Sequence, residues 1–369
     1  YGGGIYSNNS SPIISNTTIA NNTATTGGGI NFDGGSPTFT NVVISGNEAA
    51  GVFRRGGGVL INGGSATFTN VTIMNNTARM GAGVWLQNST STFTNVIIAN
   101  NTAEDYGAGI YSLNDGDPVL FNLTIANNTS PIAAGIYFDT NTSTSNLTNC
   151  ILWNNSPQEM YFSESDSAIA TYSDIQGGYP GTGNIDSYPF FVDTTNGDYH
   201  LSDYSPAIGA GTATGAPTTD ITGVTNSRPM PAGSNPDMGA YENSRINQRP
   251  KAGTIADGLG ADVDWQNNDS TLSAIWNTFT DNAALTYEYA VGTSTTALAD
   301  VVDWTSNSSG TSVTKTGLTL TEGSTYYVSV RATDTDNQLS DTTTTDGVTV
   351  DVTAPVISSV VEGSSASGS

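Results

Sequence analysis

The sequence predicts an all-β chain in which a right-handed parallel β-helix is followed by a β-sandwich. Two observations predict the β-helix: a Gly-x-Gly phrase followed by Ile or Val recurs through the first part of the chain, and an Ile-x-x-Asn phrase recurs with the same spacing. A third observation predicts the sandwich. After about residue 250 the repeat stops, and short alternating segments rich in Trp and Tyr replace it.

Two independent markers define the repeat. The last glycine of the first phrase advances by roughly 25 to 29 residues per copy, and the asparagine of the second phrase keeps the same period. A period this short, with two-residue alternation inside it, is typical of a solenoid of short strands rather than of a propeller blade. The glycines are Gly4, Gly29, Gly58, Gly83, Gly109 and Gly135, and the asparagines are Asn22, Asn47, Asn76, Asn101, Asn128 and Asn155.

Alternate residues of each copy are apolar and are expected to point into a shared interior. In Val84-Trp85-Leu86, for example, the outer two residues share one face. Cys150 stands where other copies carry Val, so we expect it to be a buried and unreactive side chain. Stacking buries a core that no single copy could bury alone. We therefore predict one coil per repeat over residues 1–157.

Asparagine is predicted at the corners of the coils for two physical reasons. Gly and Asn tolerate positive φ angles better than other residues. Identical Asn side chains, stacked at the strand spacing, can also hydrogen-bond from coil to coil. A further set with the same period predicts a second column, made of Asn16, Asn41, Asn70, Asn95, Asn122 and Asn149.

The position directly after each inward Ile or Val is expected to face outward. In register, these residues would lie about 4.8 Å apart in one column. Three consecutive aromatic residues in it predict an exposed apolar stripe, which we interpret as a partner interface, a sugar-stacking surface, or a surface covered by residues 158–243. The candidate binding residues are Tyr6, Leu60, Trp85, Tyr111 and Tyr137, with Asn31 completing the column.

The Gly-Gly-Gly-Ile and Ile-x-x-Asn-x-Ala phrases resemble the repeats of polymorphic outer-membrane-type β-helix proteins of bacteria. Residues 158–243 are similar to the closing region of secreted β-helix proteins with a choice-of-anchor region, except that Gly209 replaces an acidic residue. The resemblance implies secretion, with type IX export as the route, and a place on the cell surface; it implies no catalytic activity. The phrases are Phe191-Val-Asp193, Gly197-Asp-Tyr199, Ser205-Pro-Ala-Ile-Gly-Ala-Gly211, Arg228-Pro229 and Asp237-Met-Gly-Ala-Tyr-Glu242.

The second half of the chain divides into three further parts. Residues 244–250 are expected to form a linker, and residues 251–353 carry strands at the spacing of a β-sandwich. Tyr287-Glu-Tyr-Ala-Val-Gly292 and the run from Tyr326 to Asp334 resemble a fibronectin type III-like module of bacterial surface proteins, which implies an immunoglobulin/fibronectin type III-like sandwich. Residues 354–369 are expected to begin a following module or to form a tail.

Charge and composition exclude several functions. The net charge of -24 repels nucleic acids and anionic membranes, and no apolar run is long enough to cross a bilayer. The chain has few Lys residues and a single His, His200. The acidic pairs Glu104-Asp105 and Asp115/Asp117 are expected to be solvated corners rather than paired catalytic carboxylates. We find no catalytic constellation and predict that the segment is not an enzyme.

Calcium is the one cofactor that the sequence suggests. Four oxygen-bearing side chains stand at the alternating spacing of calcium loops but lack the glycine and bidentate Glu of an EF-hand: Asp334, Asp336, Asn337 and Asp341. A hairpin loop of the sandwich is the alternative interpretation. Asp257, Asp262 and Asp264 form a second acidic cluster.

These observations favour a non-catalytic structural or adhesive segment of a long secreted bacterial cell-surface protein or appendage. Its expected role is cell–cell or cell–surface attachment. The expected partners are further modules of the same chain at both ends, other copies of the chain, and a surface glycan or protein. Two alternatives stay open: a glycan-binding module that uses the outward column, and a polysaccharide lyase or hydrolase.

Overall fold

The computed structural model describes residues 2–114, 116–139, 144–163, 166–223, 226–281, 283–354 and 356. The chain forms two compact units, residues 1–248 and 249–369, and the division lies within the stretch 244–250 expected to be a linker. Most of the tail 354–369 lies outside the described residues.

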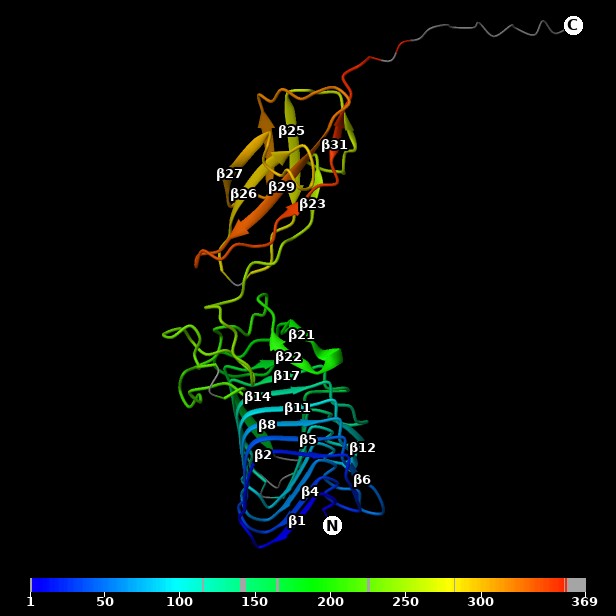
Figure 1. Ribbon diagram of the computed structural model, residues 1–369, viewed down its shortest axis with the longest axis vertical. Coiled ribbons are helices and arrows are strands. Elements are labelled where there is room, and N and C mark those ends of the chain that lie inside the picture. The colour runs from blue at the N-terminus through cyan, green and yellow to red at the C-terminus, as the bar shows by residue number, and fades with distance from the viewer. Residues whose placement is uncertain are drawn as a thin grey trace, which may run out of the picture. The chain divides into compact units, whose positions relative to one another are not determined.

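The first unit is a parallel β-solenoid, as predicted (Figure 1). One wall is a seven-stranded sheet with one strand from each coil, and its neighbouring strands are parallel and in unbroken register. Its strands, in spatial order, are β1 (Ile5–Asn8), β4 (Ile30–Asp33), β7 (Val59–Asn62), β10 (Val84–Gln87), β13 (Ile110–Leu113), β15 (Ile136–Asp139) and β18 (Met160–Phe162).

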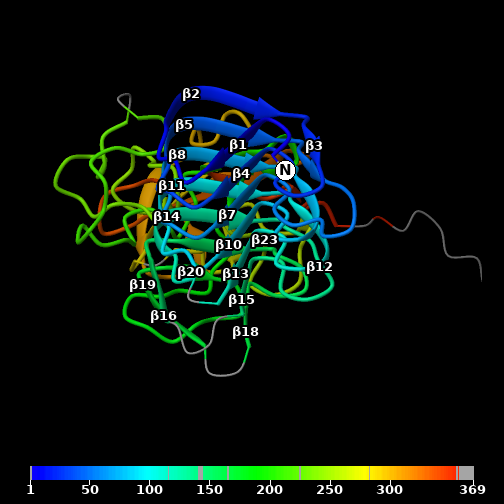
Figure 2. The same cartoon turned by 90° about the horizontal axis from the view of Figure 1, so that it is seen from below.

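The second wall is a larger parallel sheet, in which successive strands again lie side by side (Figure 2). Its eight-residue strands each contain one asparagine of the second column, while its last two coils are split into shorter strands. The strands are β2 (Ile13–Ala20), β5 (Thr38–Ser45), β8 (Thr67–Met74), β11 (Thr92–Ala99), β14 (Val119–Ala126), β16 (Thr144–Thr148), β17 (Ile151–Trp153), β19 (Ser167–Thr171) and β20 (Asp174–Ile175).

A third, narrow wall follows the Ile-x-x-Asn phrase. It consists of β3 (Thr23–Ala24), β6 (Glu48–Ala49), β9 (Thr77–Met80) and β12 (Thr102–Tyr106). The alanines that close the phrase are buried in one cluster with the alanines of the glycine phrase, among them Ala49, Ala78 and Ala103. Small side chains at this position allow the wall to approach the glycine corner closely.

The coils continue beyond the boundary expected at residue 157. Strands β18, β19 and β20 pair with β15, β16 and β17, so that the parallel pairing extends to Ile175. This last coil carries only a remnant of the two sequence phrases, which is why the period did not indicate it. The closing region is correspondingly shorter.

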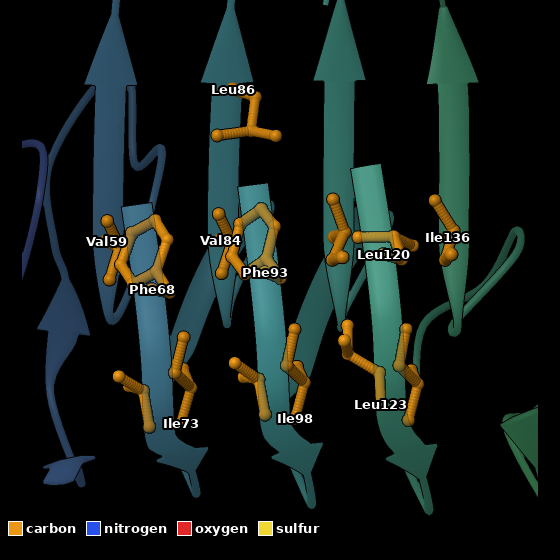
Figure 3. Packing of buried hydrophobic residues seen from close by; sticks show 14 of the residues in the cluster. Val59, Phe68, Ile73, Val84, Leu86, Phe93, Ile98, Leu120, Leu123 and Ile136 are labelled. Carbon is orange, nitrogen blue, oxygen red and sulfur yellow. The ribbon is translucent and has the colours of Figure 1, made fainter. Parts of the chain in front are cut away.

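The walls enclose one continuous apolar core, shown in part in Figure 3. Phe39, Phe68 and Phe93 stack face to face, with ring centroids 4.7 and 4.6 Å apart, because the register places them at the same point of successive coils. Cys150 is fully buried in this core, and burial raises the pKa of its thiol to about 12. It is therefore unreactive, as the sequence predicts.

A buried ladder of asparagines runs along the solenoid from Asn22 to Asn155. Asn47, for example, donates from Nδ2 to Asn76 Oδ1 at 3.0 Å and to the carbonyl oxygen of Ile19 at 2.9 Å. Its own Oδ1 accepts from the side-chain and backbone nitrogens of Asn22. Each rung therefore satisfies its polar atoms through the neighbouring coils, which a buried amide requires. Glu159 ends the ladder by accepting from both nitrogens of Asn155.

Positive φ angles occur at asparagines outside the ladder. The second column, from Asn16 to Asn149, has φ between 50° and 55°, and the residue before most ladder asparagines is also left-handed, such as Asn100 at 56°. The ladder asparagines themselves are absent from this set. The second column therefore combines both physical reasons, since its side chains also hydrogen-bond from coil to coil, as from Asn41 Nδ2 to Asn16 Oδ1 at 3.1 Å, whereas the ladder uses hydrogen bonding alone.

The closing region packs against the outer face of the second wall. Its regular elements are β21 (Phe191–Asp193), the 3-10 helix Thr194–Asn196 and β22 (Asp198–Leu201). Tyr199 and Ala240 are buried against Ile97 and Ala126 of the wall. The second asparagine column contributes polar contacts, since Asn149 exchanges two hydrogen bonds with the backbone of Thr212.

Buried charges fix this closing region. Arg228 and Glu242 form a fully buried ion pair at 3.2 Å, and Arg228 also donates to the carbonyl oxygens of Gly239 and Ala240. Asp237 accepts from the backbone of Gly209 at 2.8 Å. Gly209 has φ +63°, and a Cβ there would lie 2.2 Å from the carbonyl oxygen of Ile246, so glycine is required at this position.

The second unit contains two sheets, as expected for a β-sandwich. One consists of three antiparallel strands, and the two sheets enclose a core in which Leu272 and Ala274 pack with Val291, Val328 and Val350. The first sheet contains β23 (Ile255–Asp257), β25 (Thr271–Trp276) and β28 (Ser312–Thr316). The second contains β24 (Trp265–Gln266), β31 (Val348–Val350), β29 (Thr325–Thr333), β26 (Thr286–Gly292) and β27 (Val302–Ser308), with β30 (Thr343–Thr344) beside β29. None of the helical segments in the described residues has the length and apolarity of a membrane-spanning helix.

Asn101→Ala should destabilise the first unit by roughly 2–4 kcal/mol. The substitution removes the acceptor for both nitrogens of Asn76 and the donor to the carbonyl oxygen of Ile73, all in a buried setting. Chemical denaturation of the full chain measures the loss. Thr102→Ala, at the exposed next residue, is the control and should change the free energy of unfolding by less than about 0.5 kcal/mol. Equal effects of the two substitutions would show that the ladder is not important for stability.

Two buried carboxylates near the last coil should make stability depend on pH. Burial raises the pKa of Glu159 to about 7 and that of Asp174 to about 8. One oxygen of Asp174 accepts from the backbone of Ser187, and the other has no hydrogen-bond partner. The folded chain therefore binds protons more tightly than the unfolded chain, so its stability falls as pH rises from about 4 to 8.

Asp174→Asn should stabilise the chain by roughly 2–4 kcal/mol at pH 8 and weaken this pH dependence, because the amide cannot ionise. Asp303→Asn, at an exposed position of β27, removes the same formal charge and serves as the control. Thermal unfolding midpoints between pH 5 and pH 8 provide the measurement. A stability that rises over this range in the parent chain would contradict the expectation.

Candidate functional site

The outward column predicted from the sequence is present on the first wall. Register places Tyr6, Asn31, Leu60, Trp85, Tyr111 and Tyr137 side by side, and Tyr161 of the last coil extends the series. The rings of Trp85 and Tyr111 are parallel with centroids 4.4 Å apart, and Tyr111 and Tyr137 are stacked at 5.0 Å. Tyr111 also donates from its hydroxyl to Asp139 at 2.6 Å.

The expectation that this stripe is exposed is wrong for its middle. Leu60, Trp85 and Tyr111 are buried, with Trp85 only 2% exposed. Tyr6 at one end and Tyr161 at the other are exposed, and Tyr137 is half-buried. Burial raises the pKa of Tyr111 and raises that of Tyr137 to about 12, so both phenols are neutral at physiological pH.

Among the described residues, those that cover the buried middle belong to earlier coils of the solenoid, and none of them lies within 158–243. Met80 and Tyr106, at the ends of β9 and β12, pack against the column. Arg55 lies over Trp85, with its guanidinium carbon 4.8 Å from the ring centroid, in cation–π contact. We call residues 50–56 the Phe53 loop. The sequence indicates this loop by the spacing of the ladder asparagines, which is 29 residues from Asn47 to Asn76 but 25 from Asn22 to Asn47.

A pocket of about 240 Å³ lies between the Phe53 loop and the first wall. Its lining comes from two rows of outward residues on β4, β7 and β10, together with the loop and the preceding corner. The first row is part of the column, and the second row stands two residues later on the same strands. The lining residues are Thr26, Asn31, Asp33, Phe53, Arg55, Leu60, Asn62, Trp85 and Gln87.

The pocket combines an exposed aromatic ring with hydrogen-bond donors and acceptors. Phe53 is 62% exposed. Asn62 donates to Asp33 at 2.7 Å, which leaves further acceptor and donor capacity on both side chains. Arg55 contributes a buried Nε with no hydrogen-bond partner. Such a mixture of aromatic, amide, carboxylate and guanidinium groups is suited to a small polyhydroxylated ligand.

The pocket lacks the groups that glycoside hydrolysis requires. Among the described residues that line it, Asp33 is the one carboxylate, whereas that chemistry normally uses a pair. Elsewhere, Glu104 and Asp105 form ion pairs with Arg54 and Arg79, and Asp115 lies outside the described residues. His200 is half-buried beside Asp198 and stacks on Tyr241.

Two of the four residues proposed for calcium have other side-chain partners in the second unit. Asp334 is buried, and its Oδ1 accepts from the backbone of Asp336 and Gln338. Asp341 pairs with Arg249 at 2.6 Å. Asn337 occupies the left-handed position of the turn, with φ +63°. These contacts are those of a closed hairpin loop, the alternative interpretation of this sequence.

The comparisons with known proteins concern the fold. No match to a curated protein was found. A solved α-L-rhamnosidase from Dictyoglumus thermophilum matches 28% of this chain and 12% of its own length, at 17% identity and a TM-score of 0.22. Residues 57–186 match the family model of the right-handed β-helix region. This part of the chain is therefore a right-handed parallel β-helix.

Proposed function

We propose that the chain is a non-catalytic structural and adhesive segment of a long secreted bacterial cell-surface protein or appendage. The observation that carries this proposal is that residues repeated in each coil contact their counterparts in the next coil. Asparagines, phenylalanines and outward aromatics of successive coils all stack on one another, which favours rigidity. The β-sandwich is then a fibronectin type III-like module, in tandem with the solenoid as in extracellular scaffolds.

On this proposal, beads coated with the full chain should attach to cells or to surface polysaccharide, while the soluble chain should release no product from polysaccharides. The stacked side chains make the solenoid a stiff support. In the described residues they bring no pair of catalytic groups together. Bead counts under flow measure attachment, with beads coated in an unrelated acidic protein as the control. Reducing-end and unsaturated-product assays measure cleavage. Steady accumulation of either product would contradict the non-catalytic assignment, and attachment no better than the control would contradict the adhesive one.

We propose glycan binding as a second candidate function, and the pocket beside the Phe53 loop favours it. An exposed ring can pack on the apolar face of a sugar, while Asp33, Asn62 and Arg55 can hydrogen-bond its hydroxyl groups. The pocket is smaller than the roughly 300–1,000 Å³ typical of drug-sized ligand sites, so its ligand would be about one sugar ring.

Phe53→Ala should weaken binding to a glycan selected on an array by at least about tenfold, because it removes the exposed ring of the pocket. Val52→Ala is the matched control, since Val52 is 81% exposed on the same loop and does not line the pocket. Neither substitution should change the unfolding midpoint. Trp85→Ala is unsuitable as a test, because the loss of a buried, stacked ring would cost roughly 3–5 kcal/mol of stability. Unchanged binding by Phe53→Ala would contradict this candidate.

A further inference from the structure

Three carboxylates of the second unit converge at one edge of the β-sandwich. Asp257 ends β23, Asp262 lies in the turn before β24, and Asp346 precedes β31. One oxygen from each of them lies within 4.8 Å of the others. Asp264, which the sequence placed in the same acidic cluster, is not a member of the group, and Asp346, far away in the chain, replaces it.

Asp257 supplies a second observation that points to a ligand. Its side chain is buried, at 1% exposure; the Thr345 hydroxyl lies beside the carboxylate, and Oδ1 makes no hydrogen bond of good geometry. Its Oδ2 accepts from the backbone of Gly347 at 3.0 Å. A buried carboxylate oxygen without a donor is costly unless something else compensates it.

The local charge is also uncompensated. None of the ion pairs within the described residues includes Asp257, Asp262 or Asp346. Ionised carboxylates this close repel one another, and a bound cation would relieve this repulsion.

We propose that Asp257, Asp262 and Asp346 bind one calcium ion. Calcium takes oxygen ligands at about 2.3–2.6 Å, so the ligands of one ion are at most about 5 Å apart, and the oxygens of this group lie within 4.8 Å of one another. Asp262 and Asp346 are exposed, which leaves room for water to complete the coordination sphere.

The position of the ion would fasten the two sheets together. Asp257 belongs to the sheet of β23, β25 and β28, while Asp346 leads into β31 of the other sheet. Asp262 lies between them, and its Oδ1 already accepts from the backbone nitrogen of Asp257 at 3.0 Å. Calcium would thus cross-link the sandwich, with the moderate affinity of roughly 10⁻⁴–10⁻³ M typical of extracellular modules.

Isothermal titration of the full chain with CaCl₂ tests the proposal, with MgCl₂ titrated in parallel. We expect one saturable site for calcium, binding to magnesium at least about tenfold weaker, and a higher unfolding midpoint with calcium. Magnesium should bind less well because it demands compact octahedral geometry. The absence of a saturable heat of binding, or equal binding of both ions, would overturn the assignment to calcium.

Asp346→Asn should weaken calcium binding at least tenfold, and it should leave the fold intact because the side chain is exposed and the amide is isosteric. Asp262→Asn gives an independent test, since its amide oxygen can still accept from Asp257. Asp264→Asn, an exposed residue of the same turn outside the group, is the matched control and should bind like the parent. A loss of binding in the control equal to that in Asp346→Asn would show that calcium only screens the net negative charge, and would overturn the site.

Discussion

Register is the constraint on which the structure of the first unit depends. A buried asparagine can satisfy its amide only if the next coil places another asparagine at the same height, one strand spacing away. Asn76 meets this condition on both sides, since it accepts from Asn47 and donates to Asn101. A slip of one residue in any coil would remove a rung and would also turn the apolar residues of the strands outward. The ladder and the core therefore fix the same register.

The end of the ladder shows how strong this constraint is. After Asn155 no further asparagine is available, and Glu159 accepts from both of its nitrogens. A carboxylate can serve there because the terminal rung needs only acceptors. The cost is a buried acid whose pKa is raised to about 7, close to Asp174, which is also buried. The solenoid thus ends with groups that are most compatible with the fold when protonated.

Periodicity explains both what could be predicted and what could not. The core, the parallel register and the outward column follow from residues that recur in every coil, so the sequence predicts them. The third wall was missed because strands of two residues, such as β6, carry no alternation. A cover over Trp85 was one of the predicted alternatives, but its source was missed, because the Phe53 loop with Arg55 occurs in one coil only. The roles of Arg228 and Asp237 in holding the closing region together were likewise hidden, since most of their partners are backbone groups, which carry no sequence signal.

Binding sites are expected where the repeat is interrupted. A repeated residue is restricted by its neighbours above and below, so it has little freedom to acquire a ligand. The pocket beside β4, β7 and β10 arises where four extra residues interrupt the period. The three-carboxylate group likewise lies outside the solenoid, where Asp346 joins two acids from a turn far away in the chain. On these proposals the regular coils provide support, and the two proposed binding sites lie at positions where the repeat imposes no constraint.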